Sequence, residues 1–461
     1  MNIKKVVVIG SGTMGSGIAA QIANANIDVT LLDLPSKEGS RNQITENAKE
    51  RIKKSRPPLL VEKNKAELIK VGNIEDDFNE VAEADWVVEA VVERIDIKHN
   101  IYDKIQTTRK NNSIISSNTS TIPLKILSAN MSDEMKKNFC ITHFFNPVRY
   151  MALLEIVTEE VNDIEKINLL KQFCDEKLGK GVIICNDTPG FIGNRIGVYA
   201  MQVAMTEAFK MKISIEEADA VFGRPMGIPK TGIFGLYDLI GIDLMADVLK
   251  SFIKELPKED PFHEVAQEIP LVRKRIETGY TGRKCKGGVY RMNTSDGKKI
   301  LEAINLETGE YHPSQKINLG MGDKIDINKL IQRKDKDGEY AKSSLTKVIR
   351  YAAYLIPDVS SKYIDIDDAL RLGFNWTVGP FEMLSNIDTK NFIDQNTDIY
   401  FFKDLKGVFE FNKRPGYLDS SIDNLRSLNL QKTFENPSAN VKNAASYQVV
   451  EFTTKANALD T

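Results

Sequence analysis

The chain has 461 residues, a formal net charge of −2 and a pI near 6.2, with 42% hydrophobic and 27% charged residues. This length suffices for two or three domains with cores of their own, and the balanced charge argues against a nucleic-acid partner or a membrane surface. No run approaches the roughly 18 apolar residues of a membrane span, and the start "MNIKKVVVIGSG" does not have the pattern of a signal peptide. The cysteines are scattered and none has zinc-ligand spacing to a histidine, so we expect a cytoplasmic protein with no metal and with reduced thiols at Cys140, Cys174, Cys185 and Cys285.

The first elements predict a dinucleotide site. "KKVVVIG" is typical of a buried parallel strand, "SGTMGSGIAAQIANAN" of a helix built from small residues, and "DVTLLD" of a second strand. The glycine-rich turn between them would let a pyrophosphate approach the backbone at the helix N-terminus, and the acid at the end of the second strand would accept hydrogen bonds from the adenosine ribose. Because that carboxylate would repel a 2′-phosphate, the pattern favours NAD over NADP. The predicted cofactor residues here are Gly10, Gly12, Thr13, Met14, Gly15 and Asp33.

A polar, strongly basic stretch over 37–70 interrupts the alternation of strands and helices. "RPPLL" divides it, which predicts a helical hairpin that protrudes between two strands. Such a run is ordinarily a solvated surface. Its place beside a cofactor site also allows a second interpretation, a clamp for a phosphorylated substrate.

Strands return over 84–93, 113–120, 138–146, 152–157 and 181–187. In open α/β sheets, functional groups gather at the ends of the strands. Polar side chains end three of these strands: Glu93, Asn118, Ser120, His143 and Asn146. His143 is one of only four histidines, and Glu155 lies at a similar depth on the next predicted strand.

From residue 189 onward the pattern is helical, starting with "GFIGNRIGVYAMQVAMTEAF". The stretches 214–243 and 365–388 share an acidic helix start, an alanine, a Gly-x-Phe step and a closing Ile-Asp. This predicts a duplicated helical unit. The segment 291–340 lacks apolar periodicity, so we expect a connecting excursion with little core.

The stretches "GSGTMGSGIA", "VVEAVVE", "SSNTST", "HFFNP" and "NDTPGFIGNR" together resemble the L-3-hydroxyacyl-CoA dehydrogenase family. The resemblance implies oxidation of the 3-hydroxyl of an acyl-CoA to a ketone by NAD, in fatty-acid β-oxidation. It implies that His143 is the general base, Glu155 the carboxylate that orients it, and Ser120 and Asn194 the groups that bind the substrate oxygen. It also adds cofactor contacts from Glu93, Lys98, Ser120, Asn146 and Lys284, although Cys285, Lys286 and Val289 depart from the family pattern around the last of these.

The sequence therefore predicts an α/β Rossmann-type domain followed by an all-α domain with a duplicated unit. We expect a Rossmann domain over 1–188, helical units over 189–290 and 341–430 joined by 291–340, and a linker with a lone strand over 431–461. The duplication resembles that of long, bifunctional-type dehydrogenases, so a monomer becomes plausible beside the homodimer of short ones. "YQVVEFTTKANALD" resembles the start of an enoyl-CoA hydratase domain, and we expect this chain to be the dehydrogenase part of a larger bifunctional protein or to associate with a hydratase.

Two other functions remain open at this stage. A β-hydroxyacid dehydrogenase acting on a small free acid shares the glycine motif but has no HFFNP. A catalytically silent NAD-binding homologue would not need to keep Ser120, His143, Glu155 and Asn194 together.

Overall fold

The computed structural model describes residues 2–267, 269–295, 298–321, 325–403, 431–435, 439–444 and 447–452. The chain divides into two compact units, Met1–Phe409 and Glu410–Thr461. Among the described residues, no helix combines the length and the apolar character that a membrane span requires.

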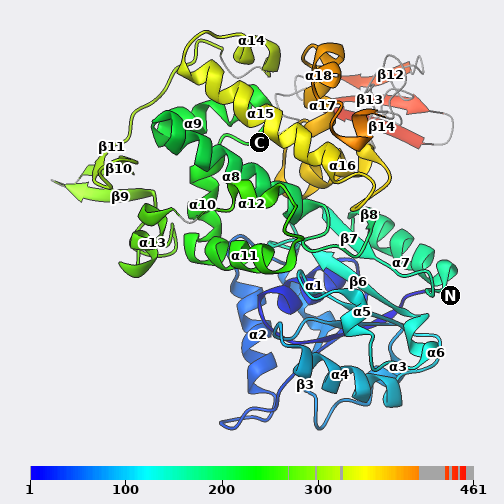
Figure 1. Cartoon of the computed structure of the whole chain (residues 1–461). Helices are drawn as coiled ribbons and strands as arrows, with labels where there is room; N and C mark the ends of the chain where they lie inside the picture. The colour runs from blue at the N-terminus through cyan, green and yellow to red at the C-terminus, as the bar shows by residue number, and fades with distance from the viewer. Residues whose placement is uncertain are drawn as a thin grey trace. The chain divides into compact units, whose positions relative to one another are not determined.

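The first unit begins with an eight-stranded sheet in the order β3-β2-β1-β4-β5-β6-β7-β8 (Figure 1). Neighbouring strands run parallel except β6 and β7, which are antiparallel, and β8 is again parallel to β7. The strands are β1 Lys5–Ile9, β2 Asp28–Asp33, β3 Ile69–Asn73, β4 Trp86–Glu89, β5 Ile114–Ser117, β6 Phe139–Phe144, β7 Leu153–Val157 and β8 Gly181–Cys185. The helices between them are α1 Thr13–Asn24, α2 Gln43–Lys54, α3 Glu80–Glu83, α4 Ile95–Thr108, α5 Leu124–Leu127, α6 Asp133–Lys136 and α7 Ile164–Glu176.

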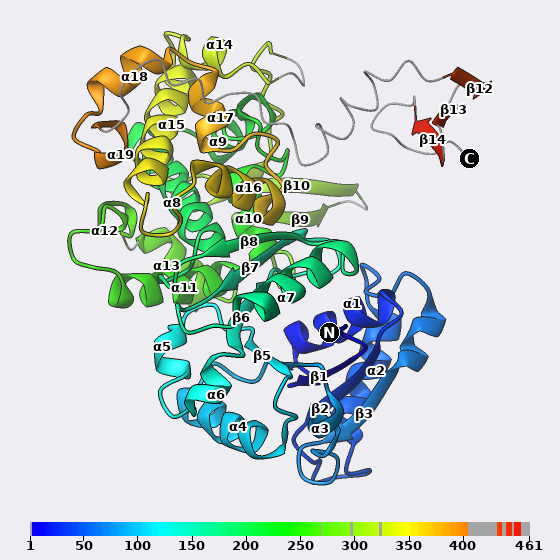
Figure 2. The same ribbon diagram turned by 90° about the vertical axis from the view of Figure 1, so that its right-hand side faces the viewer.

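The sheet forms where the sequence is richest in Val and Ile, because strands covered on both faces need apolar side chains on both. Val6, Val7 and Val8 of β1 are all fully buried. Figure 2 shows α1, α2 and β1–β3 (blue) grouped at one end of the sheet, and β7 and β8 next to the helical second half of this unit. The predicted Rossmann-type fold class is confirmed.

The predicted helical hairpin over 37–70 is wrong in its second half. One long helix, α2, is followed by a loop, the short 3-10 helix η1 (Lys63–Leu68) and the edge strand β3. Ile69 is buried and Lys70 exposed, as at the edge of a sheet, but Gly72 and Asn73 are both buried, so β3 shows no regular alternation. Two apolar side chains beside a lysine give too weak a pattern to predict this strand, which exists because β2 pairs with it.

The helical second half of this unit is built around α8 (Gly193–Met211), which is buried along most of its length and packs on α15 (Lys336–Tyr354). The other elements are α9 Ile215–Val221, η2 Arg224–Met226, α10 Gly232–Ile240, α11 Ile242–Glu255, α12 Phe262–Val265, α13 Pro270–Glu277, α14 Ile327–Ile331, α16 Tyr363–Phe374, α17 Pro380–Ser385, α18 Thr389–Gln395 and α19 Tyr400–Lys403.

The two repeated stretches make the same contact. Asp219 of α9 accepts hydrogen bonds from the amides of Phe234 (2.7 Å) and Gly235 (3.1 Å) at the start of α10. Asp367 of α16 accepts them from Phe381 (2.8 Å) and Glu382 (3.1 Å) at the start of α17. In both units a carboxylate therefore satisfies the free amides at the N-terminus of the following helix.

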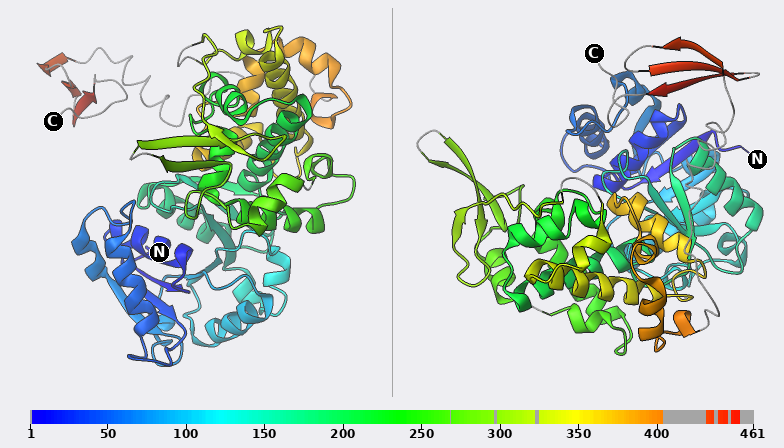
Figure 3. Two further views of the ribbon diagram at one scale, coloured as in Figure 1. Left: turned by 90° about the vertical axis from the view of Figure 1, so that its left-hand side faces the viewer. Right: turned by 90° about the horizontal axis from the view of Figure 1, so that it is seen from above.

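The segment 291–340 is more ordered than expected. It contains most of a three-stranded antiparallel sheet of β9 (Tyr290–Ser295), β10 (Lys298–Ile304) and β11 (Tyr311–Pro313), followed by α14 and the start of α15. Figure 3 shows this yellow-green ribbon extending away from the helices. A cross-strand ion pair, Arg291 with Glu302 at 2.6 Å, and the buried Ile304 hold the ribbon, and neither produces helical periodicity in the sequence.

The second unit also differs from expectation. The strand predicted at "YQVVEF" is present as β14 (Tyr447–Phe452), but it pairs with β13 (Ala439–Ala444), which pairs in turn with β12 (Gln431–Glu435). The stretch expected to be a linker is therefore partly strand. The remainder of the hydratase-like motif, 453–461, lies outside the described residues.

Candidate active site

The glycine-rich turn has the geometry that a phosphate needs. Gly10 has a φ of +103°, and a Cβ there would meet the carbonyl oxygen of Ala90 at 2.4 Å. A Cβ on Gly15 would lie 1.8 Å from the carbonyl oxygen of Gly10, so the helix can approach the strand only without one. A Cβ on Gly12, in contrast, would have no atom within 4 Å apart from its chain neighbours and the nearby helix backbone. The backbone at the start of α1, where Thr13 and Met14 follow, is therefore open to a ligand.

Asp33 ends β2 next to this turn. Its Oδ2 accepts hydrogen bonds from the amide (2.6 Å) and the hydroxyl (2.7 Å) of Ser11, and its Oδ1 accepts from the amide of Leu34 (2.7 Å). A carboxylate has about four acceptor positions. One position on Asp33 thus remains for a ribose hydroxyl, and the bonds from Ser11 fix the carboxylate to the glycine-rich turn.

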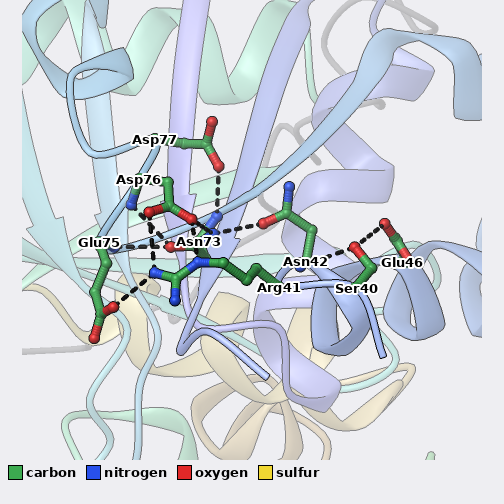
Figure 4. A network of polar contacts seen from close by, with 8 residues as sticks. All are labelled: Ser40, Arg41, Asn42, Glu46, Asn73, Glu75, Asp76 and Asp77. Carbon is green, nitrogen blue, oxygen red and sulfur yellow. Dashed lines mark hydrogen bonds and ion pairs between the residues drawn. The ribbon is translucent and has the colours of Figure 1, made fainter. Parts of the chain in front are cut away.

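The nearby guanidinium of Arg41 is already engaged (Figure 4). Arg41 donates through Nε to Asp76 at 2.5 Å and through Nη2 to Glu75 at 2.8 Å. The loop that carries these acids is tied to the end of β2, because the amide of Ile74 donates to the carbonyl oxygen of Asp33 at 2.9 Å. The hydrogen bonds of Asp76 and Glu75 raise the pKa of Arg41 above its ordinary value. A 2′-phosphate at the end of β2 would therefore meet an Arg41 that is already paired with Asp76 and Glu75.

His143 and Glu155 face each other directly across the antiparallel pair β6–β7. His143 Nδ1 lies 2.7 Å from Glu155 Oε2, and both residues are buried, with 5% and 0% of their surfaces exposed. The rings of Phe145 and Phe191 lie 4.6 Å and 5.4 Å from the imidazole, measured between centroids. The imidazole is therefore held in one orientation, with Nε2 as its remaining polar atom.

The other oxygen of Glu155 is bound by the start of α8. Glu155 Oε1 accepts hydrogen bonds from the amides of Ile192 (3.0 Å) and Gly193 (2.8 Å). The turn before the helix has positive φ at Gly190 (+76°) and at Phe191 (+50°). Oε1 of Glu155 thus accepts two amide hydrogen bonds, and its Oε2 is placed to accept a third from the Nδ1–H of His143. This leaves Nε2 free to act as a base.

A second buried ionic group lies at the ends of β4 and β5. Lys98 of α4 is 1% exposed and contacts Glu89 at 2.8 Å and Glu93 at 3.1 Å. Thr119 and the amide of Ser120 also donate to Glu93. Partial burial raises the pKa of Glu93, but Lys98 and these hydrogen bonds outweigh it, so the pKa lies below its ordinary value. Glu93 is therefore an anion that organises the backbone around Ser120.

Glu89 of this group was not identified from the sequence. It accepts hydrogen bonds from Tyr102 (2.6 Å) and Ser117 (2.7 Å) and is fully buried. Its only signal in the sequence is a carboxylate inside the apolar run "WVVEAVV". The backbone amides of Ile192 and Gly193 have no signal in the sequence at all.

The remaining predicted site residues fall in three places. Ser120 and Asn194 are partly exposed, and neither side chain has a hydrogen-bond partner among the residues that the structure describes, so both are available to a ligand. Asn118 accepts from the amide of Phe144 at 3.0 Å and so joins the ends of β5 and β6, while Asn146 is exposed just after β6. Lys284 is exposed in a turn closed by the Gly282–Gly287 bridge, against α10. That turn has no described contact with the glycine-rich turn, and the cofactor role of Lys284 stays a prediction.

The basic stretch after β2 divides into two groups. Lys49 donates to the carbonyl oxygen of Ile69 (2.6 Å), and Arg51 donates to that of Ser11 (3.2 Å), so both have structural partners. Lys53 and Lys54 lie at the exposed end of α2, and their one carboxylate partner among the described residues is Glu50.

Comparisons with known proteins show which family the two halves of the first unit resemble. Residues 5–188 match the model of the 3-hydroxyacyl-CoA dehydrogenase NAD-binding domain, and residues 190–292 match that of the 3-hydroxyacyl-CoA dehydrogenase C-terminal domain. The chain is 38% identical over 300 residues to a probable 3-hydroxyacyl-CoA dehydrogenase of Deinococcus radiodurans, covering 65% of this chain and 85% of that protein.

Two further similarities extend over almost the whole chain. A putative fatty acid oxidation complex trifunctional enzyme of Rickettsia felis is 39% identical over 464 residues, which is 99% of this chain and 64% of that protein. The chain thus spans under two thirds of that relative's length. The crystal structure of Escherichia coli 3-hydroxybutyryl-CoA dehydrogenase matches with a TM-score of 0.66 over 93% of this chain and 99% of that one, at 22% identity, which supports the fold.

Proposed function

The chain belongs to the 3-hydroxyacyl-CoA dehydrogenase family, and we propose that it oxidises L-3-hydroxyacyl-CoA to 3-ketoacyl-CoA with NAD, as a step of fatty-acid β-oxidation. The observation that carries the proposal is the buried pair of His143 and Glu155, whose carboxylate is also held by two amides of α8. A histidine fixed by a carboxylate through Nδ1, with Nε2 free, is suited to remove a proton from a hydroxyl.

Each residue of the proposed site has its own role in the oxidation. His143 Nε2 takes the proton of the 3-hydroxyl while the hydrogen on C3 leaves as hydride. Glu155 keeps the proton on Nδ1 and stabilises the imidazolium that forms. Ser120 and Asn194, whose side chains have no described partner, donate hydrogen bonds to the substrate oxygen as it becomes a carbonyl and hold C3 in line for the transfer.

NAD fits the first half of the sheet. The open space at Gly12, the free amides at the start of α1 and the carboxylate of Asp33 are suited to its pyrophosphate and its adenosine ribose. When bound, NAD supplies the nicotinamide that accepts the hydride. Glu93 and Lys98, with Asn146, would line the nicotinamide side.

Two alternatives are less well supported. An enzyme acting on a small free acid would not need the His143–Glu155 pair in this family's sequence context. A silent homologue would not need to keep the pair intact together with unengaged side chains at Ser120 and Asn194.

The test is an assay in the reverse direction, with NADH and acetoacetyl-CoA. We expect consumption of NADH that depends on the thioester, with no consumption when free acetoacetate replaces it. If NADH and acetoacetyl-CoA both bind but no turnover occurs, the silent homologue is the better description. Turnover of free acetoacetate at equal efficiency would support the small-acid alternative.

We further propose that the chain acts with an enoyl-CoA hydratase activity, which produces 3-hydroxyacyl-CoA. The support is the name of the Rickettsia relative, a trifunctional enzyme, and the hydratase-like motif near the C-terminus. With NAD present, the chain should give no NADH from an enoyl-CoA alone and should give it when a hydratase is added.

A further inference from the structure

A large open cavity lies in the helical half of the first unit, away from the glycine-rich turn and the His143–Glu155 pair. Its volume is about 1330 Å³. One wall is formed by α9, η2 and the start of α10, and the other by the turn 282–287, the ribbon β9–β10 and the segment 314–321. Small-molecule sites occupy about 300–1,000 Å³. The cavity is therefore large enough for a ligand bigger than a single ion.

Basic side chains reach this cavity from both walls. Lys230 comes from the helical wall. Arg283 and Lys286 come from the turn 282–287, and Lys316 comes from the segment 314–321. None of these four makes an ion pair with a carboxylate that the structure describes. Like charges around one concavity repel each other and focus a positive potential into it. An anion in the cavity would relieve that repulsion.

The two acids that line the cavity, Asp219 and Glu216, are outnumbered by these four cations. Asp219 is engaged by the amides of Phe234 and Gly235 and by the hydroxyl of Tyr290 at 2.9 Å. Burial raises its pKa to about 7, so it is only partly ionised near neutral pH. Glu216 is 6% exposed and accepts from the amide of Gln315 at 3.1 Å, which ties it to the wall. The net character of the open space is therefore positive.

Apolar side chains complete the lining. Met292 and Leu301, opposite each other on β9 and β10, are 59% and 47% exposed and both face the cavity. The apolar surface continues along the segment 314–321 with Ile317, Leu319 and Met321. Exposed apolar side chains next to unpaired cations suit a molecule with an anionic end and a flat or apolar end.

We propose that this cavity is a second ligand site, for a phosphorylated small molecule of nucleotide type, whose phosphates contact Lys230, Arg283 and Lys286 and whose base packs on Met292 and Leu301. The site is separate from the proposed active site and does not depend on the proposed reaction.

Calorimetric titration of the full chain with ADP tests this. Saturating NADH is present throughout, so that the dinucleotide site is filled. We expect one ADP per chain, and an affinity at least about ten-fold lower in Lys230→Gln/Lys286→Gln, because two charge-assisted contacts to the phosphates are lost. Inorganic pyrophosphate should bind more weakly than ADP, and Met292→Ser should weaken ADP but leave pyrophosphate unchanged.

Two control variants locate the binding. Lys298→Gln/Lys299→Gln removes the same charge from exposed positions of the same ribbon outside the cavity lining, and should leave ADP affinity within two-fold. Lys171→Gln/Lys177→Gln removes it from exposed positions at α7, outside the cavity lining, and should also have little effect. The proposal is wrong if ADP does not bind in the presence of NADH, or if either control weakens binding as much as the cavity variant does.

Discussion

Replacing Glu155 with glutamine is the most direct perturbation of the proposed mechanism, because the two side chains have the same shape. The oxygen of the new carboxamide can still accept from the amides of Ile192 and Gly193. Its NH₂ group then faces His143 Nδ1 at the position where Glu155 Oε2 now lies, 2.7 Å away. A donor at that position requires Nδ1 to accept, which places the imidazole proton on Nε2. The base would then be in the wrong tautomer.

The magnitude follows from the geometry. The imidazolium that forms during the reaction has its charge roughly 4 Å from the carboxylate, and at an effective dielectric constant of about 20 their attraction is about 4 kcal/mol. Each ~1.4 kcal/mol is a factor of ten in rate. Loss of this attraction should therefore lower kcat by about 10³-fold, and the wrong tautomer acts in the same direction.

The assay is steady-state reduction of NAD with L-3-hydroxybutyryl-CoA, the direction in which the imidazolium forms. NADH binding, measured by its fluorescence, should be unchanged. Glu207→Gln is the matched control, because Glu207 is also buried, lies on α8 and forms an ion pair with Lys347 at 2.6 Å. This control should lower the thermal midpoint but leave kcat near that of the wild type. If Glu155→Gln kept kcat within about three-fold of the wild type, the carboxylate would not act through the histidine.

Four other perturbations test the same structure. His143→Gln or His143→Ala should lower kcat by about 10²–10⁴-fold with NAD affinity unchanged, and near-normal turnover would refute its role as the base. Asp33→Ala should reduce the preference for NAD over NADP, measured as the ratio of their kcat/KM values; an unchanged ratio would exclude the ribose contact. Neutralising Lys53 and Lys54 should raise KM for an acyl-CoA more than for an acyl-pantetheine, whereas equal effects would make them a solvated surface. Because burial raises the Asp219 pKa from 3.8 to about 7, the stability that its neutral form contributes should be lost as the pH rises from about 4 to 7. Urea denaturation should show that loss in the wild type and not in Asp219→Asn; parallel pH profiles would contradict it.

The parts of the fold that the sequence predicts are those in which local pattern and tertiary structure agree. The valine-rich strands and the glycine motif are such parts, because each residue's environment follows from its neighbours in the chain. Strand β3 and the ribbon β9–β10 are not predicted by the local sequence pattern. Their stability comes from pairing with β2 and from the ion pair of Arg291 with Glu302, which join residues that local periodicity does not relate.

The candidate site divides in the same way. His143 and Glu155 are recognisable from the sequence because they lie on consecutive strands of one antiparallel pair, so a short separation in the chain gives the register. The amides that hold Glu155 belong to the start of α8, and backbone groups carry no side-chain signature. Glu89 could not be predicted for another reason. The role of a carboxylate in an apolar strand is recognisable only once the fold shows that Lys98 of α4 pairs with it.

The duplicated helical unit explains how the start of α8 is held in place. Arg195, directly after Asn194, donates from Nε to the hydroxyl of Tyr351 on α15 at 2.5 Å and from Nη1 to the carbonyl oxygen of Pro189 at 3.1 Å. Tyr351 in turn donates to Asp260 at 3.0 Å, and Asp260 also pairs with Arg195.

These contacts connect the second helical unit to the segment that holds Glu155. The ring of Tyr351 also stacks on Tyr199 of α8 at 3.8 Å, and Asn186 at the end of the sheet donates to the carbonyl oxygens of Pro357 and Asp358. The geometry around His143 and Glu155 therefore rests on contacts between the two helical units of one polypeptide.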